Sequence, residues 1–398
     1  MKLNKTFGRI ATTLVATAML ASVAAVPAFA EPVTSGGTAD SSLSQITIDK
    51  QLMLPTGVVT PDVTFNFNIE PANDVEENDT IVSDSKTLEV KNGIGNNMAA
   101  GSVSFSNADG IGSASSYEGI NVVTKADVIL SLTGLGTFGD AGVYKYYITE
   151  DQINIPDTET PDSDYAQDLK LPLYVFVERH TPAEGAESYY IASAVIYPDG
   201  VTADGETNSK TDVFTNWYQI TPPTDPGEEP IINSGNLSVT KKVTGTMGDR
   251  SEEFEFKVAG LEANAPYRVA YTGTGSSAEN MIANSDGEIT LNLKHDEVAT
   301  IYGIDEKSNG YSISENGTTL NSEGYTLTGV KVDGKTAEIS DNGVTVSVVK
   351  GQVTSAEFTN NREAVSPTGI VMNVAPYVLL VVVAAAGCFV FLRKRRED

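Results

Sequence analysis

The stretch that decides the fold reads Val63-Thr-Phe-Asn-Phe-Asn-Ile69, in which apolar and polar side chains alternate. Such alternation places the apolar side chains on one face of a β-strand. Similar short segments, rich in β-branched and aromatic residues and bounded by turn signals, recur at Tyr144–Ile148, Leu173–Val177, Tyr189–Tyr197, Tyr325–Val332 and Val344–Val349. No long amphipathic helix is evident. The pattern therefore predicts an all-β chain that folds into sandwiches.

A proline-rich stretch divides this strand pattern into two parts. It reads Pro222-Pro-Thr-Asp-Pro-Gly-Glu-Glu-Pro230. Proline lacks the amide donor that a central strand needs, so this stretch is expected to form a semi-rigid linker. We predict two Ig-like β-sandwich domains in tandem, at residues 41–218 and 236–362, joined by a linker at residues 219–235.

The N-terminus predicts export. Three basic residues precede an apolar run from Ile10 to Ala25, and Ala28-Phe-Ala30 supplies the small residues of a cleavage site. These are the parts of a secretory signal peptide, which we assign to residues 1–30. A retained membrane helix is the alternative, but the apolar run is short and the small-residue site follows it directly.

The C-terminus predicts attachment to a cell wall. Val365-Ser-Pro-Thr-Gly369 precedes an apolar stretch from Ile370 to Leu392, which is about long enough to cross a bilayer, and a cluster of basic residues follows. A Thr-Gly bond ahead of a membrane helix and a basic tail is the layout of a cell-wall sorting signal, here residues 365–398. An ordinary single-pass anchor is the alternative, although it needs no Thr-Gly motif.

Composition narrows the classes of partner. The chain has 53 acidic and 26 basic residues, a net charge of −27, and removing both predicted signals makes the balance still more negative. Such a surface repels nucleic acid and lacks a polybasic patch for membranes, so neither is expected as a partner. The single cysteine, Cys388, lies in the C-terminal apolar stretch. The exported part therefore has no disulfide to stabilise it.

The sequence offers no site for a conventional enzyme. Its two histidines, His180 and His295, lie in no metal-spaced or triad-like context, and HExxH, GxSxG and phosphate-loop motifs are absent. The acidic clusters at residues 74–79 and 157–164 do not follow the EF-hand spacing, so we expect solvated loops there. We predict no catalysis on a separate substrate, no cofactor and no metal.

Two sets of polar residues lie in register with apolar residues on predicted strands, where they would face a core. Each set contains a Lys, a Glu and an Asn in that order along the chain. The sets are Lys50, Glu150 and Asn216, and Lys241, Glu315 and Asn360. Their surroundings also match: Thr-Ile-Asp-Lys corresponds to Ser-Val-Thr-Lys, Tyr-Ile-Thr-Glu to Ser-Ile-Ser-Glu, and Phe-Thr-Asn ends both.

Burial is expected to make the side chains of each set reactive toward one another. Desolvation lowers the pKa of a lysine and raises that of a glutamate, which leaves a nucleophilic amine beside a proton donor. The protonated Glu can polarise the Asn carbonyl and move protons while the amine attacks the Asn Cγ. Ammonia then leaves and an amide joins Lys to Asn. A buried salt bridge assisted by Asn is the alternative, which explains the recurrence of the same order in both halves less easily.

The chain resembles a backbone (major) pilin of Gram-positive bacteria, of the streptococcal pilin isopeptide-linkage type. The resemblance rests on the Lys-Glu-Asn strings, on Lys241-Lys-Val-Thr-Gly-Thr-Met-Gly-Asp-Arg250 and on the sorting motif. It implies an intramolecular amide (isopeptide) bond between the Lys and the Asn of each set, assisted by the Glu of that set. Both strand parity and the family pattern select Lys241 rather than the adjacent Lys242.

The resemblance also implies covalent polymerisation. A pilin-class sortase would cleave between Thr368 and Gly369 and transfer the threonine acyl group to a lysine of the next copy. The family pattern points to Lys210 as that acceptor, although Lys210 lies one residue closer to Asn216 than the pattern has it. The two residues share parity, so a regular strand would turn Lys210 inward unless a bulge or a later strand start intervenes. A solvated surface lysine is the alternative.

These features together predict a structural major subunit of an extracellular pilus, a fimbrial subunit that is secreted and fixed to peptidoglycan. The expected partners are a pilin-class sortase, other copies of the chain, and tip and base pilins. A monomeric wall-anchored adhesin is the alternative function. A secreted enzyme lacks any constellation of site residues.

Overall fold

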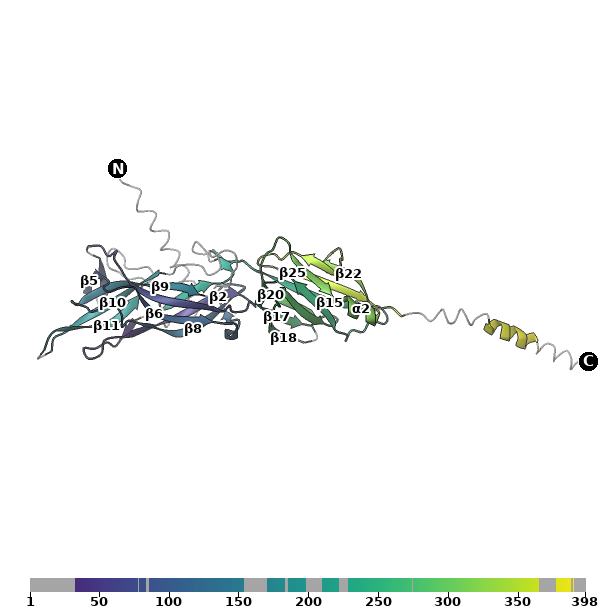
Figure 1. Ribbon diagram of the computed structural model, residues 1–398, viewed down its shortest axis with the longest axis horizontal. Coiled ribbons are helices and arrows are strands. Elements are labelled where there is room, and N and C mark those ends of the chain that lie inside the picture. Colours follow the sequence, from purple (N-terminus) through teal and green to yellow (C-terminus); the bar gives the residue numbers. More distant parts are fainter. Residues whose placement is uncertain are drawn as a thin grey trace, which may run out of the picture.

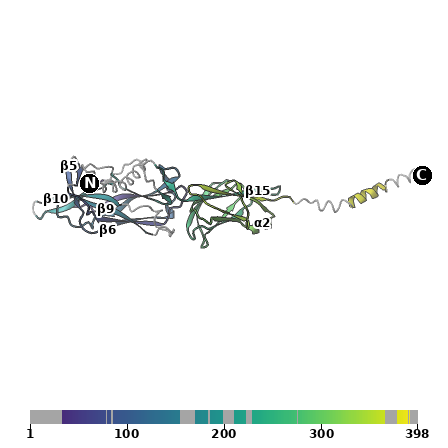
Figure 2. The ribbon, with the colours of Figure 1, turned by 90° about the horizontal axis from the view of Figure 1, so that it is seen from above.

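The fold is known from a computed structural model, which describes residues 33–77, 79–83, 86–153, 170–182, 185–197, 210–221, 228–273, 275–364, 377–387 and 389. Strands dominate these residues and form two β-sandwiches that lie end to end along the long axis of the molecule (Figure 1). The view from above shows the same arrangement (Figure 2). The predicted all-β fold with two tandem sandwiches is confirmed.

The N-terminal sandwich packs an eight-stranded sheet against a four-stranded sheet. The larger sheet has the order β1-β11-β10-β9-β3-β6, with β5 paired to β9 and β4 paired to β5. Its strands are β1 (Val33–Ser35), β3 (Val63–Pro71), β4 (Thr80–Ser83), β5 (Lys86–Asn92), β6 (Met98–Phe105), β9 (Gly142–Ile153), β10 (Lys170–His180) and β11 (Ser188–Ile196). A short 3-10 helix, η1 (Asn107–Asp109), follows β6.

The smaller sheet of this sandwich has the order β12-β2-β8-β7. Its strands are β2 (Gln45–Pro55), β7 (Ser113–Ala114), β8 (Ile120–Ser131) and β12 (Val213–Trp217). A single apolar core fills the space between the two sheets and includes Phe65, Leu130 and Tyr146. The alternating segment at Val63–Pro71 buries its apolar residues in this core, as its pattern predicts.

The C-terminal sandwich packs a seven-stranded sheet, β18-β17-β20-β15-β25-β22-β23, against a four-stranded sheet, β19-β16-β21-β24. The larger sheet contains β15 (Gly235–Thr244), β17 (Pro266–Thr272), β18 (Ser277–Ile282), β20 (Val298–Ile304), β22 (Thr326–Val332), β23 (Lys335–Thr336) and β25 (Val353–Asn361). The smaller contains β16 (Phe254–Ala259), β19 (Glu288–Leu293), β21 (Tyr311–Glu315) and β24 (Gly343–Val346). A short helix, α2 (Gly317–Glu323), follows β21, and a second core lies between the sheets.

A short ribbon connects the two sandwiches. β13 (Ile220–Thr221) pairs with β14 (Ile231–Ile232) in antiparallel fashion, on either side of the proline-rich stretch. Ile220 packs in a small apolar cluster with Trp217, Met53 and Ile120 on the outer face of the four-stranded sheet. The segment that the sequence predicts to be a linker thus contains paired strands, while residues 222–227 lie outside the described residues.

The predicted export and sorting signals fall largely outside the described residues. This holds for residues 1–30, for the Thr368-Gly369 bond and for the acidic cluster at residues 157–164. Of the apolar stretch 370–392, residues 377–387 form a helix whose apolar side chains are exposed (Figure 1). None of the helices within the described residues combines the length and the apolar character needed to span a membrane.

Candidate functional site

The Lys and the Asn of each predicted set lie on adjacent, parallel strands. β12 pairs with β2 so that Phe214 lies opposite Lys50, and Asn216, two residues further on, occupies the neighbouring diagonal position. β25 pairs with β15 in the same register and brings Asn360 diagonally next to Lys241. In both sandwiches the lysine is on the first strand of this parallel pair and the asparagine is on the last strand of the domain. Residues distant in sequence therefore meet by the same geometry twice.

The structure places both sets in the interior. Their exposed fractions are 0% for Lys50, Asn216, Lys241 and Asn360, 5% for Glu150 and 3% for Glu315. The glutamates come from the facing sheets, on β9 and β21. Each set thus bridges the two layers of its sandwich, where an isolated charge would be costly.

In the N-terminal cluster the three side chains touch one another. The Nζ of Lys50 donates to Oε2 of Glu150 at 2.6 Å and also to Oδ1 of Asn216. A hydrogen bond between Asn216 and Glu150 closes the triangle. The second carboxyl oxygen of Glu150, Oε1, is buried and has no hydrogen-bond partner among the residues that the structure describes.

The C-terminal cluster centres on one carboxyl oxygen. Oε1 of Glu315 accepts from Nζ of Lys241 at 2.6 Å and from Nδ2 of Asn360 at 2.7 Å. Within the described part of the chain, Oδ1 of Asn360 and Oε2 of Glu315 are buried without a partner. A buried acceptor that lacks a donor costs free energy, so this unreacted arrangement is incompletely satisfied.

Phenylalanine rings lie beside both lysines, and these rings were not predicted from the sequence. The Nζ atom lies 4.2 Å from the centroid of Phe65 in the first cluster and 4.2 Å from that of Phe254 in the second. An edge-to-face aromatic pair adjoins each cluster, with centroids 5.3 Å and 5.1 Å apart; these pairs are Phe67 with Phe214 and Phe256 with Phe358. The signal that could have found them is the Phe-x-Phe spacing shared by β3 and β16.

Burial shifts the pKa values of both partners toward their neutral forms. Desolvation lowers the pKa of Lys50 and of Lys241 to about 8, although the neighbouring carboxylate opposes the shift. Desolvation also raises the pKa of Glu150 and of Glu315, and here the adjacent lysine opposes it. A neutral amine beside a protonated carboxyl group is therefore far more accessible here than for the same groups in water.

The structure distinguishes the two adjacent lysines of β15. Lys241 points into the core, whereas the half-exposed Lys242 pairs with Asp296 on the surface. His295 has a structural contact, because its Nδ1 accepts from the backbone N–H of Val243 at 2.8 Å. The orientation of Lys241 agrees with strand parity.

Lys210 is exposed and precedes β12, which begins only at Val213. The later strand start removes the conflict with parity, since Lys210 is not part of the regular strand. Its Nζ lies 6.0 Å from the centroid of the Tyr197 ring, and the neighbouring Thr211 N–H donates to the carbonyl of Ile196 at the end of β11. Lys210 is therefore exposed to solvent, and it lies close to Asn216 in the sequence.

The acidic cluster at residues 74–79 shows ordinary surface contacts. Asp74 accepts from the hydroxyl of Tyr147 at 2.6 Å and from Lys145 at 3.4 Å. Among the described residues, no group of three or more His, Cys, Asp and Glu side chains is arranged to hold a metal ion. The two Lys-Glu-Asn clusters are thus the arrangements whose chemistry stands out.

Comparison with known proteins agrees with the predicted resemblance. The family described as "Domain of unknown function (DUF7601)" matches residues 235–362. A protein of Streptococcus pyogenes serotype M1 named Pilin is 27% identical over 395 residues, which cover 95% of this chain and 98% of that protein. The predicted resemblance to pilins of Gram-positive bacteria is therefore confirmed over nearly the whole chain.

Two solved structures are also similar. The crystal structure of the major pilin from Streptococcus pyogenes is 21% identical, with a TM-score of 0.44, and the match covers 81% of this chain and 99% of that one. The major pilin protein T3.2 from S. pyogenes serotype GAS13637 is 17% identical, with a TM-score of 0.39, and the match covers 83% of this chain and 99% of that one.

Proposed function

We propose that the chain is the major structural subunit of a covalently polymerised surface pilus, and that each sandwich forms one internal Lys-Asn amide bond. The proposal rests on one observation: a Lys, a Glu and an Asn lie together in the buried interior of both sandwiches. The strands that hold the Lys and the Asn pair in the same parallel register in both. Residues 41–218 and 236–362 would be the two crosslinked domains, with residues 219–235 between them. The similarity to a streptococcal pilin supports this role.

The contacts of the C-terminal cluster support a direct route to the bond. The neutral Nζ of Lys241 attacks Cγ of Asn360, and Oε1 of Glu315 lies within hydrogen-bond distance of both the attacking and the leaving nitrogen. The carboxyl group can take a proton from the amine and deliver one to Nδ2. The Cγ–Nδ2 bond breaks, ammonia departs, and the new Nζ–Cγ amide is neutral. Glu315 is returned to its starting protonation state.

The N-terminal cluster contains the same groups for the bond between Lys50 and Asn216, with Glu150 as the acid and base. The buried setting favours the reaction because the titratable lysine is replaced by a neutral amide, which removes the cost of burying its charge. The surrounding rings also exclude water, which would otherwise compete with the amine for the Asn carbonyl.

Polymerisation would join Thr368 of one copy to a lysine of the next through a pilin-class sortase, with membrane-held precursors and peptidoglycan as the final anchor. The exposure of Lys210 supports its proposed role as acceptor. Co-expression with that sortase should give a ladder of high-mass species in boiled, reduced wall extracts. Lys210→Ala should remove the ladder, whereas Lys335→Ala, at another exposed lysine, should preserve it. A single monomer band from the unaltered chain would contradict the proposal and favour a monomeric wall-anchored adhesin.

A further inference from the structure

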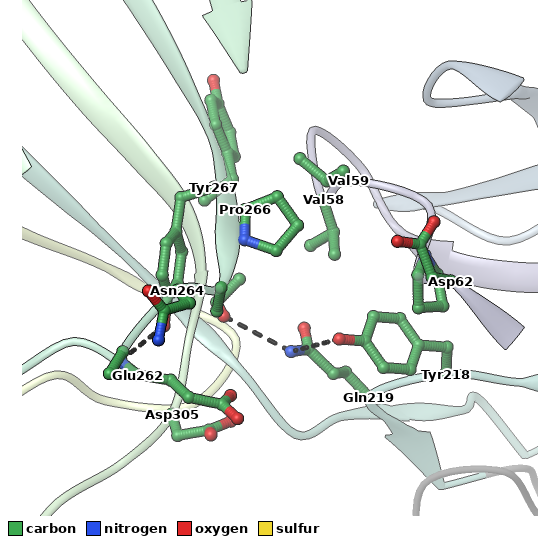
Figure 3. Close-up of a pocket in the computed structure, with 15 residues that line it drawn as sticks. Val58, Val59, Asp62, Tyr218, Gln219, Glu262, Asn264, Pro266, Tyr267 and Asp305 are labelled. Atoms are coloured by element: carbon green, nitrogen blue, oxygen red, sulfur yellow. Dashed lines mark hydrogen bonds between the residues drawn. The ribbon is translucent and has the colours of Figure 1, made fainter. Parts of the chain in front are cut away.

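A cavity of about 240 Å³ lies at the junction of the two sandwiches (Figure 3). One side is formed by the loop between β2 and β3 and by the chain that follows β12. The other side is formed by the segment leading into β17 and by the end of β20. The cavity takes no part in the chemistry proposed for the Lys-Glu-Asn clusters, so whatever it binds concerns a separate property of the chain.

Gln219 carries an unused hydrogen-bond acceptor into this cavity. The residue is only 9% exposed, and its Nε2 donates to the carbonyl of Gly303 at 3.3 Å across the junction. Its Oε1 has no donor anywhere in the part of the chain that the structure describes. Figure 3 shows this oxygen directed toward the space between Val58 and Pro266. Since a buried acceptor without a donor is costly, a bound N–H group would relieve the cost.

The rim of the cavity is acidic. Asp62, Glu262 and Asp305 line it, and no Lys or Arg is among the described residues that do so. Burial, and then the nearby charge of Asp305, raise the pKa of Glu262. Lys307, a cation close to Glu262, instead donates to the backbone carbonyl of Gly260 at 2.7 Å. The site therefore offers acceptors and negative charge to a ligand that brings donors and positive charge.

The remaining wall is apolar and aromatic, so it suits a carbon stem rather than a hydrated ion. Val58 and Pro266 face each other across the opening (Figure 3), and Tyr302 also lines the cavity. We propose that this junction cavity binds an organic cation, an alkylammonium or alkylguanidinium group, whose N–H donors reach Gln219 Oε1 and the rim carboxylates. A free amine or a Lys or Arg side chain of a peptide would present the same group.

Binding can be measured by calorimetry and ligand-detected NMR on a segment, residues 31–364, that contains both sandwiches. The probes are n-butylammonium and n-butylguanidinium, with 1-butanol as the neutral control. Both cations should bind saturably and more tightly than the alcohol. Gln219→Leu should weaken cation binding about tenfold or more, because it removes a hydrogen bond to a charged group. Cations that bind no better than 1-butanol would overturn the proposal.

Two further variants keep the test decisive if Gln219→Leu does not fold. Glu262→Gln alters an exposed rim carboxylate and should weaken cation binding severalfold, while Glu338→Gln, which does not line the cavity, should leave it unchanged. Equal effects of these two substitutions would contradict a specific site. Capped peptides containing one Lys or one Arg separate the sources: binding as tight as that of the free cation identifies a peptide side chain, and binding of the free cation alone identifies a small amine.

Discussion

Replacing Glu150 by Gln should block the amide bond of the N-terminal sandwich while keeping the size and shape of the side chain. An amide cannot carry the proton from the lysine amine to the leaving nitrogen, so Lys50 and Asn216 should stay separate. The intact mass of residues 31–364 should then fall short of its calculated value by one molecule of ammonia, whereas the unaltered segment should fall short by two. Asp151→Asn, an exposed neighbour on β9, is the matched control and should lose two.

The cost in stability can be worked from the loop that the bond closes. Lys50 and Asn216 are 166 positions apart. In the chain-entropy treatment used for disulfides, a crosslink over such a loop stabilises the fold by about 5 kcal/mol. The variant also buries Lys50 without its carboxylate, which adds to the loss, although the amine can become neutral and limit it.

The assay is thermal or guanidinium unfolding followed by a probe for the N-terminal sandwich, such as the fluorescence of the buried Trp217. For a domain of this size a loss of about 5 kcal/mol lowers the melting temperature by about 10–20 °C. A Glu150→Gln segment that still lacks two ammonias would refute the role of Glu150. A Glu150→Gln segment that lacks a single ammonia but has the same melting temperature as the unaltered segment would refute the estimated loss of stability.

Three further predictions concern the same clusters. Lys241→Ala should restore one ammonia to the intact mass, whereas Lys242→Ala should not, because only the first lysine reaches Glu315; tandem mass spectrometry of the crosslinked peptides checks both. In Asn216→Ala the lysine cannot react, and the folded-state pKa of Lys50 of about 8 lies below the value of 10.5 for the unfolded chain. The unfolded state then binds more protons between these values, so the stability of the variant relative to the unaltered segment should rise from about pH 8 to pH 10.5 in denaturant titrations. The contribution of Lys50 should stay level on either side of that window. A flat difference across it would contradict the buried, unreacted lysine. Phe256→Ala should cost the C-terminal sandwich about 3–5 kcal/mol and slow bond formation by admitting water, which a time course of ammonia loss after refolding would detect; Phe176→Ala, at a half-exposed ring in the other sandwich, should not slow it.

Strand parity was enough to identify the polar residues that face the two cores. Lys241 and Lys242 illustrate this, because a period of two allows only one of them to point inward. The order of the strands, by contrast, cannot be predicted from parity. Parity assigns a face to Lys50 and to Asn216 but does not say that β2 and β12 are neighbours, parallel and offset by two residues. That information resides in the packing of the whole sandwich.

Other features could not be fully predicted from the sequence because they depend on short or irregular segments. Lys210 shares parity with Asn216, and the sequence left open whether a bulge or a later strand start exposes it; β12 begins only at Val213. The pairing of Ile220 with Ile232 is too brief to give a periodic signal, and prolines nearby favour a linker. The cavity beside Gln219 is built by loops of both sandwiches, so it has no local signature.

The β13–β14 ribbon has a consequence for a fibre under load. Tension between Lys210, the proposed acceptor, and Thr368 enters the chain just before Asn216, and it crosses the C-terminal sandwich through the proposed bond between Lys241 and Asn360. The stretch from Asn216 to Lys241 has no such covalent shortcut.

Within that stretch the ribbon is held by its strand pairing, by the hydrogen bond of 2.8 Å from Asn233 N–H to the Gln219 carbonyl, and by the small cluster around Trp217. A strong pull would therefore open the ribbon before either sandwich deforms, and each residue released would add up to about 3.5 Å of length. The ribbon between the two sandwiches would then lengthen under load and re-form when the load falls, once in every subunit of the fibre.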